Sequence, residues 1–194
     1  MRRIAPLLLL LSLTALFGCS NSEDYFTLGS KEEQQELRLL KQMLEEEPKD
    51  SPRHSVLVQQ IARKLLAAGS PEKMRIFLTE HVQSHLDDPV NGYYLYLVAR
   101  SYDEAEAAPV RRMYLRRVLR NYPDVEVDSS STHLIALQEL VELVEDPDER
   151  VSYYKQLLDR FSEELDQGEL YYRLAKSHEA AGEWDEAYQA YREF

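Results

Sequence analysis

Two histidines one helical turn apart are the residues of this chain with the clearest capacity for chemistry. His81 and His85 are four positions apart in a segment predicted to be helical, so both imidazoles face the same way, as two metal ligands would. Zinc takes three or four protein ligands, and no third ligand lies near this pair in the sequence. We therefore expect a solvated, structural pair on a helix exterior and no metal site.

The remaining acid–base residues have structural explanations. His178 falls in a packing position, so we expect a core histidine with a satisfied ring and not a catalytic base. Acidic pairs flank Pro147, where helix capping accounts for them. The sequence contains no glycine-rich phosphate loop, G-x-S-x-G elbow, H-E-x-x-H motif or EF-hand loop. We expect a non-enzymatic protein with no cofactor.

Composition narrows the classes of partner and site further. The chain has 194 residues, with 23 Lys and Arg against 35 Asp and Glu, which gives a net charge of −12. This balance opposes the phosphate backbone, so nucleic acid is excluded as a partner. Cys19 is the single cysteine, so neither an intramolecular disulfide nor a cysteine-based zinc site can form.

The N-terminus has the layout of a bacterial export signal. Two arginines precede an apolar tract, Leu7–Phe17, which is too short to span a membrane. The tract ends in Leu16-Phe17-Gly18-Cys19, which resembles the lipobox of bacterial lipoproteins. The resemblance implies that residues 1–18 are a signal peptide and that Cys19 receives a diacylglycerol and becomes the new N-terminus.

The sequence around the cysteine also indicates where the protein works. The lipoprotein sorting rule uses aspartate after the cysteine to retain a protein in the inner membrane, and Ser20 stands there instead. The resemblance therefore implies the outer membrane, with the chain facing the periplasm. Residues 19–30 show no periodicity and are predicted to be a lipid-anchored tether, which reaches at most about 40 Å. We expect the folded part to bind a partner near its own membrane.

The end of the chain carries a helical-hairpin motif. Tyr171–Phe194 resembles a tetratricopeptide (TPR) repeat, in which a Leu-small pair, a turn glycine and a small residue occupy set positions. Leu174-Ala175, Gly182 and Ala187 fill those positions in order.

The same pattern recurs toward the N-terminus. Steps of 37, 39 and 37 residues lead from Leu174, His178 and Tyr191 to positions that stay apolar or bulky. These columns are Leu174, Leu137, Val98 and Ile61; His178, Val141, Tyr102 and Leu65; and Tyr191, Tyr154, Leu115 and Leu78. Prolines at positions 71, 109 and 147 lie where each second helix would begin.

The repeats predict the architecture. We expect an all-α, right-handed superhelical solenoid of about four TPR-like hairpins over residues 55–194, with residues 31–48 as an N-terminal capping helix. The position of Ala187 is taken by Arg150, Arg111 and Met74 in the earlier copies, so we expect those paired helices to lie further apart.

A partner-binding groove follows from the repeat assignment. In TPR proteins the exposed side of each first helix lines the inner face of the superhelix, and a mixture of rings and charges there fits an extended peptide or a partner helix. An ordinary solvated helix face is the alternative. The groove positions in this chain would be Gln59, Arg63, Tyr96, Arg100, Ile135, Glu139, Tyr172 and Lys176.

A basic strip lies on the second helix of the second repeat. Arg112, Arg116 and Arg120 recur every four residues and so share one helix face. They could meet an acidic partner or anionic lipid headgroups. We favour a second explanation, in which they pair with nearby acids such as Asp103, Glu104 and Glu106.

The combined pattern predicts a scaffold or adaptor that binds a protein or peptide in the cell envelope and is held to the membrane by its lipid. It resembles the TPR-containing lipoproteins that serve outer-membrane protein assembly. Two alternatives remain. One is an adaptor that docks cell-wall hydrolases or a transporter component, and the other is a small-ligand carrier that uses the aromatic groove.

Overall fold

The computed structural model describes residues 29–102 and 107–194. The predicted signal peptide, Cys19 and most of the predicted tether lie outside these residues. Nine helices and one short β-hairpin occur in the described ranges: α1 (Lys31–Glu46), α2 (Pro52–Ala67), α3 (Pro71–Ser84), α4 (Asn91–Arg100), α5 (Ala108–Asn121), β1 (Glu126–Val127), β2 (Ser130–Ser131), α6 (Thr132–Leu143), α7 (Pro147–Phe161), α8 (Gln167–Ala181) and α9 (Trp184–Glu193).

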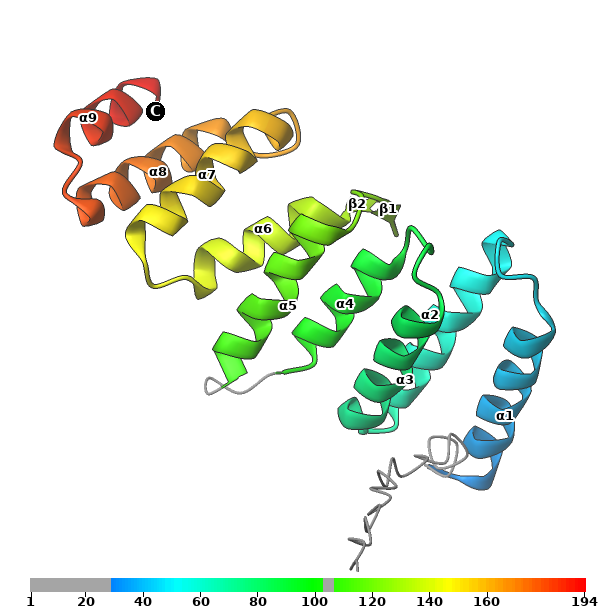
Figure 1. Cartoon of the computed structure of the whole chain (residues 1–194). Coiled ribbons are helices and arrows are strands. Elements are labelled where there is room, and N and C mark those ends of the chain that lie inside the picture. Colours follow the sequence, from blue (N-terminus) through cyan, green and yellow to red (C-terminus); the bar gives the residue numbers. More distant parts are fainter. Residues whose placement is uncertain (1–28, 103–106) are drawn as a thin grey trace, which may run out of the picture.

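The helices stack in chain order into an elongated array (Figure 1). Each helix packs against the next, and α4 also contacts α6, the first helix of the following hairpin. The array is therefore four antiparallel hairpins, α2/α3, α4/α5, α6/α7 and α8/α9, preceded by α1. The prediction of an all-α solenoid of TPR-like hairpins is confirmed.

Local sequence signals set where the helices begin. Pro71 and Pro147 are the first residues of α3 and α7, where a missing backbone N–H costs no hydrogen bond. Ser30 and Glu33 form a reciprocal capping box at the start of α1. At the last corner Gly182 ends α8 with a φ of 79°, a left-handed conformation that glycine adopts without strain.

The repeat columns form the continuous core between the helices. Ile61, Val98 and Leu137 are each 0% exposed, and Leu174 of the last hairpin is 6% exposed. Leu78 and Leu115, from the second helices, are also 0% exposed. The apolar columns of the sequence are thus the contact surfaces of successive hairpins, since burial of these side chains is the main stabilising term for such an array.

The two arginines in the column of Ala187 reach hydrogen-bond partners with the ends of their side chains, although the Nε of each is buried without a partner among the described residues. The guanidinium of Arg111 reaches Glu139 on α6, and that of Arg150 bonds to the carbonyl oxygen of Val144. Met74 alone is buried, at 2% exposure.

The segment Asp124–Ser131, between α5 and α6, contains the β1–β2 hairpin, which the sequence analysis did not predict. Asp128 and Ser129 have positive φ, which gives the tight turn between the two strands. None of the described helices is long and apolar enough to cross a membrane.

Candidate functional site

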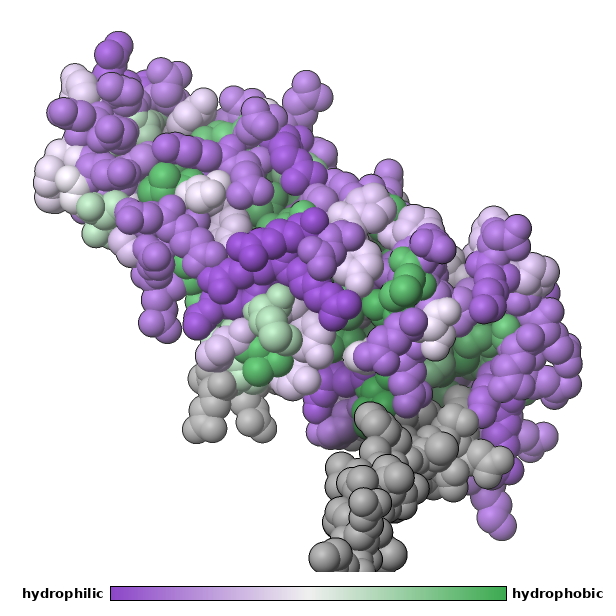
Figure 2. All heavy atoms as spheres, viewed as in Figure 1, coloured by the Kyte–Doolittle hydropathy of each residue, from purple (hydrophilic) through white to green (hydrophobic). Residues whose placement is uncertain are grey.

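The residues predicted for the groove lie in pairs on the first helices of the four hairpins. Gln59 and Arg63 are on α2, Tyr96 and Arg100 on α4, Ile135 and Glu139 on α6, and Tyr172 and Lys176 on α8. Gln59 and Ile135 are half-buried, whereas Arg63, Arg100, Tyr172 and Lys176 are exposed. Figure 2 shows one face of the molecule, on which hydrophilic side chains dominate and apolar ones are visible between them.

The structure brings three of these residues together between α4 and α6. Arg100 Nε lies 3.5 Å from Glu139 Oε1, and the Arg100 guanidinium is 5.8 Å from the centre of the Tyr96 ring. Arg111 on α5 holds the other carboxylate oxygen of Glu139 at 2.9 Å. This cluster therefore ties the second hairpin to the third.

Tyr96 is a correction to the predicted groove. Its side chain was expected on the open face, yet it is 7% exposed, because it packs beside Tyr93 beneath Arg100. Burial, together with the nearby Glu139 carboxylate, raises the pKa of Tyr96 to about 12. Its ring belongs to the core and is not free to contact a partner.

A pocket of about 390 Å³ contains the α8 pair, Tyr172 and Lys176. The Tyr172 ring is 41% exposed and lies against Tyr191 and Phe194, with centroid distances of 6.1 and 5.5 Å. The lining of the pocket combines aromatic rings with charges of both signs. The other lining residues are Val141, Glu142, Arg150, Tyr154, Glu169, Arg173 and Ser177.

Ion pairs organise the walls of this pocket. Arg173 bonds to Glu169 at 2.5 Å on its own helix and to Glu142 of α6 at 3.2 Å. Lys176 pairs with Glu179 one turn further on. Because these pairs are exposed, they can open at small cost and exchange partners with an incoming peptide.

At the α2 end of the predicted groove, Arg63 forms an ion pair with the β-hairpin. Arg63 lies 2.5 Å from Asp128 in the turn of the β1–β2 hairpin. The hairpin thus contacts the first repeat. The predicted surface is divided into an Arg63 contact, a cluster around Glu139 and the α8 pocket.

Two of the three arginines in the basic strip contact the next hairpin, and the third, Arg120, is exposed. Arg116 holds both oxygens of Glu149 on α7, at 2.8 and 2.5 Å, and Arg112 donates to the carbonyl oxygen of Leu143 at 2.8 Å. Burial opposes the charged form of Glu149, but hydrogen bonds from Tyr153 and Arg116 outweigh it and lower its pKa. The acids named as partners from the sequence, at positions 103, 104 and 106, lie outside the described residues.

Three of the five histidines meet at the first hairpin. His54, from the first turn of α2, lies beside His81 and His85 at the end of α3, with ring centroids 5.4 and 5.3 Å away. His81 and His85 stack with centroids 4.2 Å apart. One potential ligand atom from each ring lies within 4.8 Å of those of the other two. This set has the ligand type and number that a zinc-class ion requires.

The expectation of a solvated histidine pair is therefore wrong for His81, which is 6% exposed. Sequence reasoning missed His54 because it lies 27 residues before His81. The predicted pairing of the two helices could nevertheless have identified His54. In an antiparallel hairpin the first turn of one helix lies beside the last turn of the other, and this places His54 next to His81.

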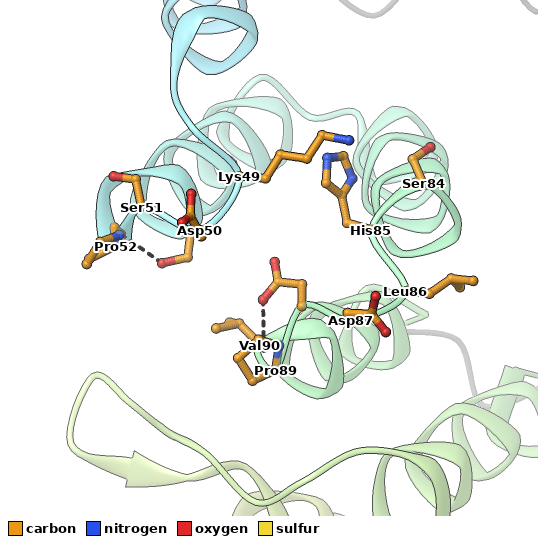
Figure 3. Close-up of a pocket in the computed structure, with 12 residues that line it drawn as sticks. Lys49, Asp50, Ser51, Pro52, Ser84, His85, Leu86, Asp87, Pro89 and Val90 are labelled. Atoms are coloured by element: carbon orange, nitrogen blue, oxygen red, sulfur yellow. Dashed lines mark hydrogen bonds between the residues drawn. The ribbon is translucent and has the colours of Figure 1, made fainter.

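A pocket of about 590 Å³ adjoins the histidines, between the segment 49–52 and the segment 84–90 (Figure 3). His85 lines it, with its ring next to the Lys49 side chain. Asp88 also lines it, and accepts a hydrogen bond from the backbone N–H of Val90 at 2.9 Å. Burial opposes ionisation of Asp88, but hydrogen bonds from His81 and Val90 lower its pKa.

Similarity to solved structures defines the class of fold. A crystal structure from Podosopora anserina with nearly identical TPR-like repeats matches with a TM-score of 0.52 and 16% identity, over 89% of each chain. A point variant of the same protein matches at 0.51 and 17% identity, over 87% of each chain. MamA matches at 0.49 and 14% identity, over 81% of this chain and 83% of that chain. The two Podosopora anserina matches show that the chain has a TPR-like fold.

No protein-family model and no curated protein matches the sequence.

Proposed function

We propose that this protein is a non-enzymatic scaffold that binds an extended peptide segment of an envelope protein in the α8 pocket. The observation that carries the proposal is the combination found there: an exposed tyrosine ring beside Lys176, Arg173 and Glu169 in a pocket of about 390 Å³. A tyrosine brings large contact area with few rotatable bonds, so it is a favoured residue at binding hot spots. Charges of both signs around it fit the polar backbone and side chains of a peptide.

The pocket chemistry favours a peptide over a small apolar ligand. Ligand-carrier pockets are lined mainly by apolar side chains with a few polar groups. Here five of the lining residues are ionisable acids and bases, namely Glu142, Arg150, Glu169, Arg173 and Lys176. An apolar ligand in this pocket would cover these charged groups without offering them any hydrogen bond.

We further propose that the scaffold is lipidated at Cys19 and tethered to the outer membrane, where it takes part in outer-membrane protein assembly. The support is the lipobox-like sequence and the short tether, which would hold the TPR-like array within about 40 Å of the membrane surface. A role as an adaptor for wall hydrolases or a transporter component requires the same anchor and the same groove. The identity of the captured partner separates the two.

The test uses charge reversal in the native envelope. We expect Arg173→Glu combined with Lys176→Glu, two exposed residues that line the pocket, to abolish recovery of the cross-linked partner while the helical circular dichroism stays unchanged. The matched control is Arg53→Glu with Lys155→Glu, which makes the same charge change on α2 and α7 outside the proposed surface. Unchanged recovery with the first pair would rule out this surface. Mass spectrometry of the partner then distinguishes barrel-assembly proteins from hydrolases or transporter subunits.

A further inference from the structure

The first hairpin carries a histidine cluster that the scaffold function does not use. We infer that His54, His81 and His85 bind a transition-metal ion of the zinc class, with Asp88 positioning His81. Three imidazoles are the ligand set of well-known zinc sites, and imidazole also suits copper and nickel.

The geometry needs only small side-chain adjustments to close on an ion. Zinc–nitrogen bonds of about 2.0–2.1 Å in a tetrahedron place ligand nitrogens about 3.3 Å apart. The candidate atoms already lie within 4.8 Å of one another. The three residues stand on the ends of two packed helices, so the backbone holds the rings together before any ion arrives.

The hydrogen bonds around the cluster leave lone pairs available for an ion. His85 Nδ1 lies 3.0 Å from the carbonyl oxygen of His81, and because a carbonyl only accepts, Nδ1 must carry the proton. Its Nε2 is then a free base. Metal-bound histidines ordinarily donate their other ring N–H to a carbonyl or a carboxylate in this way. Asp88, with Oδ2 3.5 Å from His81 Nε2, is placed to do the same for His81.

Unsatisfied polar atoms concentrate at this place. His54 is 4% exposed, and neither of its ring nitrogens makes a well-formed hydrogen bond with a described residue. The buried Tyr94 hydroxyl, whose ring packs edge-on against His81, is likewise unpaired within those residues. A buried polar group without a partner destabilises the folded chain, and an ion bound by His54 would offset that cost.

His85 lines the adjoining pocket, so one side of the cluster faces this opening. With three protein ligands, the fourth position would be open to water or to a group entering the adjoining pocket, on the side of His85 and Asp88.

The test is a zinc titration of the full chain, purified without a polyhistidine tag and stripped with a chelator. We expect one equivalent of Zn²⁺ to be withdrawn from a chromophoric chelator, and added Zn²⁺ to raise the Tm by mass action. Co²⁺ in place of Zn²⁺ should give the visible absorption of tetrahedral coordination. A wild-type chain that takes no Zn²⁺ from the chelator would overturn the inference.

Variants assign the ligands. Loss of a residue that only positions a ligand lowers metal affinity by roughly 10- to 100-fold, and we expect that loss for Asp88→Asn. His54→Gln and the more exposed His85→Gln each remove a ligand, so each should lower the affinity by more. His133→Gln is the control, since this buried histidine lies on α6 and bonds to Tyr122 and Arg160. Equal affinity in the His85→Gln and wild-type chains would overturn the inference, even if His54→Gln fails to fold.

Discussion

The contact between Arg116 and Glu149 gives the most quantitative prediction of how the hairpins are held together. Arg116 binds both carboxylate oxygens of Glu149, and the Tyr153 hydroxyl donates to the same carboxylate at 2.7 Å. The two charged side chains are 32% and 27% exposed. Hydrogen bonds to a charged group contribute about 1.5–3 kcal/mol when buried, and exposed ion pairs about 0–1 kcal/mol. For this partly exposed group we expect Glu149→Gln to lower the free energy of unfolding by about 1–2 kcal/mol at pH 7.

The matched control is Asp148→Asn, one residue earlier in the first turn of α7. It removes the same charge from the same helix N-terminus, but this exposed residue does not contact Arg116 in the described structure. We expect a loss of about 0.5 kcal/mol, from the helix dipole alone. Equilibrium urea unfolding, followed by circular dichroism, measures both variants.

The pH dependence supplies a second check on the same contact. The pKa of Glu149 is lowered from its ordinary value of 4.5, so its stabilisation is fully present above pH 4.5 and is lost as the pH falls through the folded-state pKa. The difference between wild type and Glu149→Gln should therefore shrink below pH 4.5. A difference that is absent at pH 7, or that stays constant down to pH 3, would refute the assignment of this contact as a structural clamp.

Two further substitutions test the packing and the turns. Leu115→Ala on α5, where the side chain is 0% exposed, should lower the free energy of unfolding in urea by about 2–5 kcal/mol. Leu66→Ala, where the side chain is 50% exposed, should lower it far less. Similar losses in the two variants would contradict the repeat register. Gly182→Ala should cost about 1 kcal/mol from its φ of 79° alone, because an added Cβ meets no atom within 4 Å; an unchanged or raised Tm would contradict this conformation.

The sequence was most informative about the repeated core. A column between the helices keeps bulky, mostly apolar side chains in every hairpin, so Ile61, Val98 and Leu137 could be located by their spacing alone. The proline and glycine positions indicated helix ends because proline fits the first turn of a helix and glycine adopts without strain the left-handed conformation that ends one. These are local or periodic constraints, which a single sequence records directly.

The residues missed by sequence reasoning depend on contacts between distant segments. His54 reaches His81 only through the antiparallel pairing of α2 and α3. Arg116 on α5 reaches Glu149 on α7, so its partner came from the next hairpin. Tyr96 occupied a face that is open in an ideal repeat, yet the neighbouring side chains cover it here. The β1–β2 hairpin needs a positive φ at Asp128 and Ser129, and neither residue type predicts that backbone conformation from the sequence.

The central claim, that the α8 pocket holds the partner, is tested most directly by site-specific photo-cross-linking in the native envelope. A photoreactive phenylalanine analogue replaces Tyr172 in one strain and Tyr188 in another. Both tyrosines are exposed, at 41% and 67%, but only Tyr172 lines the pocket. The account predicts a discrete cross-linked partner at position 172 that is weak or missing at position 188. The same products from both positions, or no product at 172, would contradict it.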